Sequence, residues 1–396
     1  MSAATSEVGT TRRWAMLAAS TVAQAAASLM IHGPAFLIPT LVTDEGLSLA
    51  QAGLVAAAPM AGVTCALVAW GLVTDRRGER LVLLTGLTGT ALAGVVAILS
   101  TGVVALGLSL FVAGLTAAST GSASGRVVVG WFPPARRGLA MGIRQTAQPA
   151  GVGLAAVSMA VIADRSGPSS ALLVPVLACA VAAMGVALVV LDPHRPPGGA
   201  AVADNPYRGD RFLPRVHAVS VLLVVPQFVV WTFALVWLVQ DRGWSPAAVG
   251  VVVAVAQVAG VAGRIGAGQL SDVVGSRMRP LRWVTWGALA SMLALGLTAG
   301  LDWGVAVPLV VVATMVTVAD NGLAFTAVAE RAGPFWSGRA LGLQNTAQYL
   351  AASAVPPLAA LAVTHAGYPA TFALAAAFPL VALALVPVRE ERAFTQ

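Results

Sequence analysis

The chain has 396 residues, of which 58% are hydrophobic and only 10% are charged, and its formal net charge is +7. A soluble protein carries about 25% charged residues, so this composition excludes a water-soluble globular protein and predicts a protein of the lipid bilayer. Arginines in the loops on the inner side of a membrane account for the positive charge without a nucleic-acid partner.

Apolar stretches of about 20 residues, the length that crosses the hydrocarbon core of a bilayer, recur along the sequence. The first stretch is too long for the core of a signal peptide, so we expect it to remain in the mature protein. We predict twelve transmembrane spans, at residues 14–39, 48–71, 81–100, 103–130, 139–163, 170–191, 215–240, 246–270, 281–300, 304–329, 339–364 and 369–388.

One long polar interval, 192–214, interrupts this series and is rich in Pro and Gly. Such a composition is typical of a flexible linker. It separates six spans from six, which predicts an N-terminal bundle at 1–191 and a C-terminal bundle at 215–396. The expected fold is therefore an all-α membrane protein with two six-helix bundles.

Arginines mark one end of these spans. They precede the first span, follow every second span and crowd the central linker, whereas the alternate loops hold only Arg165 and Arg242. Cytoplasmic loops carry an excess of basic residues. We therefore expect a multi-pass protein of the cytoplasmic membrane with both termini and the linker in the cytoplasm.

Two pairs of similar segments indicate that the halves are repeats. Residues 141–148 read MGIRQTAQ and residues 341–348 read LGLQNTAQ, while 71–80 and 268–277 share the pattern G-x-x-x-D-x-x-G-x-R. Both pairs are separated by nearly the same distance, about half of the chain, which is far longer than a solenoid repeat.

The segment 71–80, GLVTDRRGER, lies in the cytoplasmic loop after the second span. It resembles the best known motif of the major facilitator superfamily of transporters. The match covers Gly71, Asp75, Arg76, Gly78 and Arg80, whereas Glu79 stands where a basic residue is usual. The second copy keeps Gly268, Asp272, Gly275 and Arg277 but has Val273 in place of a basic residue.

The glycines of this motif permit a tight connection between helices, and its Asp can accept hydrogen bonds from a helix N-terminus or an Arg. We expect two further arginines to serve the same gating region. Arg144 is the first charged residue of the fifth span, and Arg264 is expected to support the Asp272 loop.

The resemblance implies two bundles around a central cavity with alternating access, lined by spans one, four, seven and ten. The polar residues of those spans that we expect to line the cavity are Gln24, Ser28, Thr116, Ser119, Gln227, Trp231 and Asn321. Spans five and eleven carry matched polar faces that suit either a pocket, a gate or contacts between helices: Gln148, Asn345, Gln348 and Tyr349.

Three ionisable residues are candidates for proton coupling. Asp320 lies within the tenth span, where a charged group needs a partner, a wet cavity or a function; the alternatives are a cap of a broken helix or a permanent ion pair. Arg126 resembles a buried Arg of the superfamily that is associated with proton transfer, or it snorkels to the interface. His32 precedes Gly33-Pro34, where we expect a kink, and it either carries protons or packs.

These features together predict a secondary transporter of a small organic solute. No nucleotide-binding loop is present in the sequence, so a proton gradient is the expected driving force. The modest polarity of the candidate residues favours a neutral, zwitterionic, monoanionic or moderately apolar substrate. We expect no cofactor, no metal and a monomer.

The direction of transport stays open. The exporter pattern of the fifth span is broken at Gln148 and Val152, which leaves an exporter of drug-like compounds and an importer of an organic monoanion as alternatives. A membrane sensor without transport is a third. An enzyme is not expected, because the sequence has neither H-E-x-x-H nor G-x-S-x-G.

Overall fold

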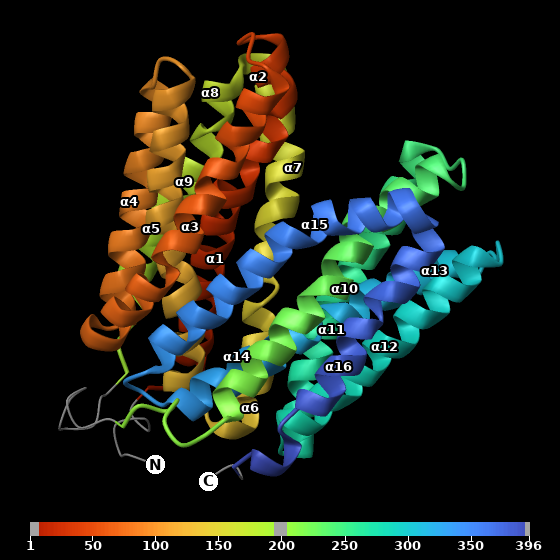
Figure 1. The fold of residues 1–396 in the computed structure, drawn as a ribbon. Helices are drawn as coiled ribbons and strands as arrows, with labels where there is room; N and C mark the ends of the chain where they lie inside the picture. Colours follow the sequence, from red (N-terminus) through yellow and green to blue (C-terminus); the bar gives the residue numbers. More distant parts are fainter. Residues whose placement is uncertain (1–7, 194–203, 393–396) are drawn as a thin grey trace. The chain divides into compact units, whose positions relative to one another are not determined.

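A computed structural model describes residues 8–193 and 204–392, and this described part contains helices and no strand. Figure 1 shows the elements along the chain. Their bounds are α1 (Thr10–His32), η2 (Gly33–Leu37), α2 (Ile38–Thr43), α3 (Leu49–Arg77), α4 (Glu79–Leu99), α5 (Val103–Trp131), α6 (Pro134–Arg144), α7 (Ala147–Ser166), α8 (Pro168–Ala171), α9 (Leu173–Val189), α10 (Phe212–Gln240), α11 (Pro246–Val274), α12 (Met278–Gly300), α13 (Ala306–Thr317), α14 (Asp320–Ala332), α15 (Ser337–Ala375), α16 (Ala377–Leu385) and η3 (Val388–Glu390).

Eleven helical segments of the described chain are long and apolar enough to cross a membrane. The last of them, Ser337–Glu390, has 54 residues, which is far more than the roughly 20 that one crossing needs. It turns at Gly367, whose φ of 78° and ψ of 172° are not helical. The segment therefore holds two crossings, in agreement with the all-helical fold and the twelve spans predicted from the sequence.

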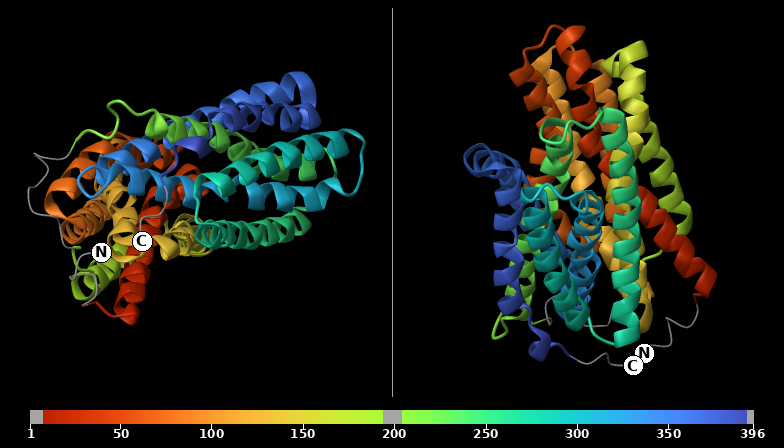
Figure 2. Two further views of the ribbon diagram at one scale, coloured as in Figure 1. Left: turned by 90° about the horizontal axis from the view of Figure 1, so that it is seen from below. Right: turned by 90° about the vertical axis from the view of Figure 1, so that its right-hand side faces the viewer.

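Contacts divide the chain into two compact units. Unit 1 comprises residues 1–132, 144–204 and 332–346, and unit 2 comprises the remaining segments 133–143, 205–331 and 347–396. These units differ from the predicted halves because most of α6 groups with unit 2 and the start of α15 groups with unit 1. Within each unit the helices run side by side (Figure 2).

The core of unit 1 is built on close contacts between helices. On α3, a methyl group added to Gly62 would lie 2.1 Å from the carbonyl oxygen of Phe111 on α5. On α5, a methyl group added to Gly114 would lie 1.9 Å from the carbonyl oxygen of Pro59. Small residues allow helix backbones to approach in a membrane, where packing replaces the hydrophobic effect. These glycines therefore fix the α3 and α5 pair, beside which Leu110 and Ala113 are completely buried.

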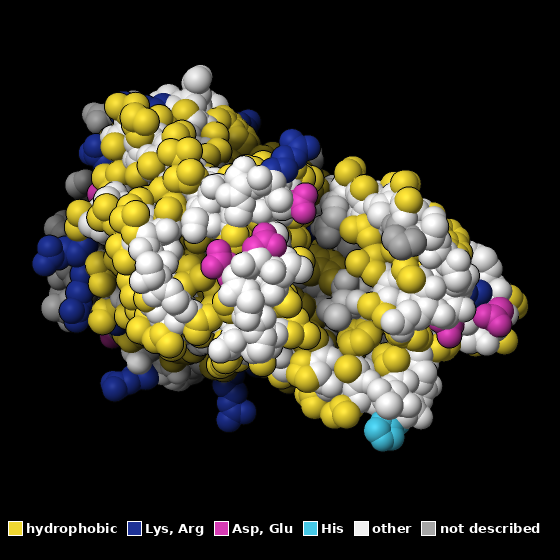
Figure 3. Space-filling view, turned by 90° about the horizontal axis from the view of Figure 1, so that it is seen from above, with side chains coloured by type: hydrophobic (Ala, Val, Ile, Leu, Met, Phe, Trp, Pro, Cys, Tyr) yellow, Lys and Arg dark blue, Asp and Glu magenta, His cyan; other side chains and the backbone are white. Residues whose placement is uncertain are grey.

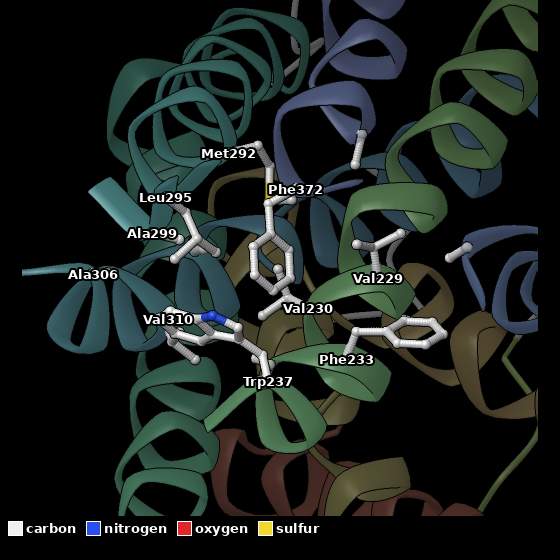
Figure 4. Close-up of a cluster of buried hydrophobic side chains, with 14 of the residues drawn as sticks. Val229, Val230, Phe233, Trp237, Met292, Leu295, Ala299, Ala306, Val310 and Phe372 are labelled. Carbon is white, nitrogen blue, oxygen red and sulfur yellow. The ribbon is translucent and has the colours of Figure 1, made fainter. Parts of the chain in front are cut away.

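The core of unit 2 surrounds Trp237 of α10 (Figure 4). Its ring meets the ring of Phe372 edge to face, with centroids 5.8 Å apart and planes at 85°, an arrangement that aromatic pairs prefer. The indole Nε1 donates to Asp241 Oδ2 at 3.0 Å, which satisfies the polar atom of a fully buried side chain. Met292 and Leu295 of α12 complete this core.

Many large apolar side chains are exposed on the helices. Leu54, Leu188 and Val273 are 74%, 77% and 79% exposed, and hydrophobic side chains spread over much of the face in Figure 3. A soluble monomer rarely exposes contiguous apolar patches larger than a few hundred Å². The surface is that of a protein whose solvent is lipid.

The described end of the linker is anchored to unit 2. Asp210 accepts the backbone N–H of Phe212, the first residue of α10, at 2.8 Å, and it pairs with Arg331. The Tyr207 hydroxyl lies 2.9 Å from His217 Nε2, and burial raises the pKa of Tyr207 to about 12. Residues 194–203 of the predicted flexible linker lie outside the described part of the chain.

Candidate functional site

The tenth span is broken next to its acidic residue. α13 ends at Thr317 and α14 begins at Asp320, so Asp320 opens the second segment, close to the break that the sequence suggested. The hydroxyl groups of Thr314 and Thr317 donate to the backbone carbonyls one turn earlier, at 2.8 and 2.7 Å. These hydroxyls are therefore satisfied by their own helix and leave the carboxyl group of Asp320 to other partners.

Asp320 is 1% exposed, and neither carboxylate oxygen makes a hydrogen bond within the described chain. The backbone N–H groups of Asp320 and Asn321 lie close to the carboxylate without the geometry of a hydrogen bond. The carboxylate has no ion pair within 4.0 Å among the described residues, so the structure does not support the permanent ion pair. The cap of a broken helix stays an alternative, because Asp320 opens α14.

Arg264 of α11 is the cation that acts on Asp320 electrostatically. It is 4% exposed, its Nη1 has no hydrogen-bond partner in the described chain, and its Cζ lies 6.0 Å from the ring centroid of Trp231. Our expectation that Arg264 supports the Asp272 loop is wrong, because Asp272 is held by Arg277 at 2.5 Å.

Three amide side chains of unit 2 form a chain of hydrogen bonds beside this pair. Asn321 Nδ2 donates to Gln227 Oε1 at 3.3 Å, and Gln348 Nε2 donates to Asn321 Oδ1 at 3.0 Å. Three predicted site residues from α10, α14 and α15 are thus brought together. Tyr349 follows Gln348 and is half-buried.

A cavity of about 170 Å³ lies between α10, α11 and α13 of unit 2. Its polar lining residues are Trp231, Gln257 and Thr314, and the other lining residues are Val, Ala and Leu. An apolar cavity with few polar groups is typical of a small-molecule site. Trp231 therefore lies at the wall of a cavity within unit 2.

Unit 1 holds a second buried polar cluster around Arg144, which is 3% exposed. Its Nε and Nη2 donate to Ser124 Oγ at 2.9 and 2.8 Å, and Nη2 also approaches Gln24 Oε1 at 3.3 Å. Ser124 in turn donates to Gln24 Oε1 at 3.3 Å. We did not predict a role for Ser124 from the sequence, although a small polar side chain within the fourth span can indicate a polar contact between helices.

Two other candidates of unit 1 lie close to each other, and one of them borders a cavity. The side chains of His32 and Gln148 approach to 3.5 Å. His32 lines a cavity of about 240 Å³ together with Phe36 and Met60. The predicted kink after His32 is confirmed, since the helix continues as the 3-10 segment η2. Asn345 donates to the carbonyl oxygen of Gly121 at 3.4 Å.

Two residues of α5 contact α4 instead of lining a cavity. Thr116 Oγ1 lies 3.0 Å from Thr90 Oγ1. Ser119 is fully buried, and a methyl group on Gly86 would lie 1.8 Å from its Oγ. Our expectation for Thr116 and Ser119 is therefore wrong. The expectation rested on the span in which the two residues lie, and that span does not show which neighbouring helix they meet. Ser28 is 1% exposed.

The first copy of the repeated loop motif, residues 71–80, binds the start of α15. Asp75 is 1% exposed and accepts the backbone N–H groups of Gly338 at 2.8 Å and Arg339 at 3.0 Å. The guanidinium of Arg339 adds a bond at 2.9 Å. Gly78 has φ of 98°, so the tight connection does require glycine. Arg80 donates to the carbonyl oxygen of Ala187 at 2.7 Å, and Arg76 is exposed.

Arg126 belongs to the same group of contacts around Asp75, and its side chain does not extend to the membrane interface. It is 4% exposed, and its guanidinium contacts Asp75 at 2.9 Å, Glu79 at 2.8 Å and the carbonyl oxygen of Pro334 at 2.8 Å. The alternative of an arginine that reaches the interface is therefore wrong. Arg126 is a buried cation between two carboxylates.

The second copy of the motif, residues 268–277, binds α6 in the same way. Asp272 accepts the backbone N–H groups of Gly138 at 2.9 Å and Leu139 at 2.8 Å. Arg277 contacts Asp272 at 2.5 Å, the carbonyl oxygen of Pro134 at 2.5 Å and Glu330 at 3.2 Å. Gly275 is left-handed, with φ of 66°. We did not predict a role for Glu330 from the sequence, because an acidic residue at the end of a span is usually exposed to solvent.

Comparison with known proteins agrees with this architecture. The sequence profile described as Major Facilitator Superfamily matches residues 18–356. The chain belongs to the Major Facilitator Superfamily. A relative from Mycobacterium tuberculosis, described as an uncharacterized MFS-type transporter, is 44% identical over 384 residues, which cover 96% of this chain and 86% of the relative.

Solved structures of superfamily transporters share the fold. The proton:xylose symporter XylE has a TM-score of 0.75 at 16% identity and covers 95% of each chain. The Escherichia coli fucose:proton symporter FucP has a TM-score of 0.78 at 13% identity, over 95% of this chain and 98% of that one. The human organic anion transporter MFSD10 has a TM-score of 0.74 at 17% identity, over 94% and 99%.

Within this superfamily member, the departure at Glu79 has a structural reason. In unit 1 the acid Glu79 stands at the start of α4 and its partner Arg126 on α5, 2.8 Å away. In unit 2 the arginine, Arg277, stands before α12, and the acid Glu330 lies on α14 at 3.2 Å. Each copy therefore has an ion pair between an arginine and a glutamate beside its motif, at positions that do not align in the two sequences. A basic residue at position 79 would face Arg126.

Proposed function

We propose that this chain is a secondary active transporter that moves a small organic solute by alternating access, and that Asp320 couples this movement to protons. The observation that carries the proposal is the isolation of Asp320, which is 1% exposed and has no hydrogen bond or ion pair within the described residues. No other acidic side chain of the described chain combines these properties. Membership of the superfamily supports the transport function itself.

The energetics of a buried carboxyl group support a proton-carrying role. An ionised carboxylate in an apolar environment costs several kcal/mol unless a partner or water compensates. Asp320 can avoid this cost by binding a proton, or by pairing with Arg264 after a small movement. The two options exclude each other, and a transporter can link each of them to a different conformational state.

The lining of unit 2 favours a substrate of low polarity. The cavity beside Trp231 offers mostly apolar walls, and the neighbouring amides Gln227, Asn321 and Gln348 already bond one another. A neutral, zwitterionic or monoanionic compound with an apolar body fits this surface.

We place the protein in the cytoplasmic membrane as a monomer, with both termini in the cytoplasm. The support is the alternation of arginines along the sequence. Transport instead of catalysis is part of the same proposal.

The experiment begins with a thermal-shift screen of the purified protein against sugars, organic acids and amphipathic drugs, because a ligand of the folded state raises apparent stability. The compound found is then used with proteoliposomes. Asp320→Asn is expected to abolish accumulation driven by a proton gradient and to retain counterflow exchange, which needs no coupling. Asp302→Asn, which removes a largely exposed acid, should retain both activities.

Full gradient-driven accumulation by Asp320→Asn would show that the coupling proposal is wrong. The same vesicles decide the direction of transport. Accumulation with an outward-directed or an inward-directed proton gradient separates an exporter of drug-like compounds from an importer of an organic monoanion.

A further inference from the structure

A pocket of about 320 Å³ lies at the start of α12 in unit 2, away from the candidate transport site. Two arginines and two tryptophans line it, with Val388 of η3 forming the opposite wall: Arg279, Arg282, Trp283 and Trp286. These four residues are spaced three and four apart, so they share one face of the helix. We propose that this pocket binds the headgroup of an anionic phospholipid.

The charge of the pocket fits an anion. Arg279 and Arg282 are exposed and have no ion pair within 4.0 Å among the described residues. The two acidic residues that follow Val388 by two and three positions are engaged elsewhere. Glu390 pairs with Arg215, and Glu391 binds Ser276 and the backbone N–H groups that begin α12. The two guanidinium groups are therefore left to a ligand from outside the chain, and guanidinium suits phosphate oxygens.

The same helix face continues as a path for acyl chains. Trp283 and Trp286 are 51% and 52% exposed, and further along the face Leu293 and Leu297 are 48% and 62% exposed. Tryptophan is enriched at the headgroup level of membranes. The order along α12, from arginine through tryptophan to leucine, matches the order of phosphate, glycerol region and hydrocarbon in one lipid molecule.

The pocket wall is held in position by the end of the chain. Glu391 Oε1 accepts the backbone N–H of Met278 at 3.2 Å, and the Arg277 backbone binds the same carboxylate. This anchoring fixes η3 beside α12. The site is therefore preformed, which lowers the entropy cost of binding.

Binding is measured by native mass spectrometry on the full-length protein in detergent, titrated with phosphatidylglycerol or phosphatidylcholine. We expect the wild-type protein to prefer phosphatidylglycerol. Arg279→Gln with Arg282→Gln should weaken phosphatidylglycerol binding by roughly 5-fold for each arginine, about 25-fold for the pair, and leave phosphatidylcholine binding unchanged. Arg208→Gln with Arg211→Gln removes the same charge from exposed linker positions and should change neither.

Two further measurements distinguish a lipid site from a misfolded variant and from a site for free anions. Arg279→Lys with Arg282→Lys retains the charge and should retain most of the preference, even if the Gln variant folds poorly. Inorganic phosphate is titrated in a thermal-shift assay as the headgroup without its chains. Equal protection by phosphate and phosphatidylglycerol would indicate a free-anion site and overturn the proposal, as would unchanged phosphatidylglycerol affinity of the folded Gln variant.

Discussion

Asp75 and Asp272 hold equivalent helices in the two units with equivalent atoms. Asp75 accepts the N–H groups of Gly338 and Arg339, and Asp272 accepts those of Gly138 and Leu139, all at 2.8–3.0 Å. The repeat is therefore visible in hydrogen bonds as well as in sequence. Each carboxylate is engaged by backbone N–H groups and an arginine, which compensates for its burial.

The first glycine of each motif copy, Gly71 and Gly268, allows direct contact between helix backbones. A methyl group on Gly71 would lie 2.4 Å from the carbonyl oxygen of Gly338, and one on Gly268 would lie 2.1 Å from that of Gly138. We expect Gly71→Ala and Gly268→Ala each to destabilise the protein by about 1–3 kcal/mol because the helices must separate. Thermal unfolding in detergent measures this. Gly107→Ala and Gly185→Ala have open space around the added methyl group and should be neutral or stabilising.

The effect of replacing Glu79 on stability should depend on the charge of the new residue. Its carboxylate is fully buried and contacts Arg126 Nε at 2.8 Å. Removing one partner of a buried ion pair costs about 3–5 kcal/mol, so Glu79→Ala should lower stability by that order. Glu79→Arg, which restores the basic residue usual in the superfamily motif, should be worse because it faces Arg126. If Glu79→Arg matched the wild-type unfolding temperature, a stabilising role of the Glu79–Arg126 pair would be wrong.

Asp320 and Arg264 should be energetically coupled although they do not touch. Asp320→Asn and Arg264→Gln each leave one buried charge without its counter-charge, whereas the double variant leaves none. We therefore expect the double variant to be more stable than the sum of the single effects predicts, with a coupling energy of about 0.5–3 kcal/mol. Unfolding of the four proteins at one pH gives this value. Additive effects would mean that Arg264 does not act on Asp320.

Two neighbouring glutamates at the end of the chain should differ in their contributions. Glu391 binds Ser276 and backbone N–H groups at the start of α12, whereas Glu390 forms a partly exposed pair with Arg215. Glu391→Gln should destabilise unit 2 by about 0.3–1 kcal/mol, because the amide keeps one acceptor oxygen but loses the negative charge at the N-terminus of α12. Glu390→Gln should cost less, because exposed ion pairs contribute little. Equal unfolding temperatures of the two variants would contradict this difference.

The sequence by itself determined the membrane class, the twelve spans, the repeat and the positions of the turn glycines. These properties are local, because the hydropathy of about 20 consecutive residues decides whether they can cross a bilayer. The break near Asp320 and the kink after His32 were also readable, since both depend on neighbouring residues in the chain.

Only the tertiary structure decided which polar residues meet. The sequence placed Thr116, Ser119 and Arg264 in their spans, but a helix in a bundle has several neighbours. α4 covers the face of Thr116 and Ser119, and Arg264 meets Trp231 while Arg277 takes Asp272. The partner of a buried charge depends on how helices cross and how closely glycines let them approach, and that information is spread over segments far apart in the sequence.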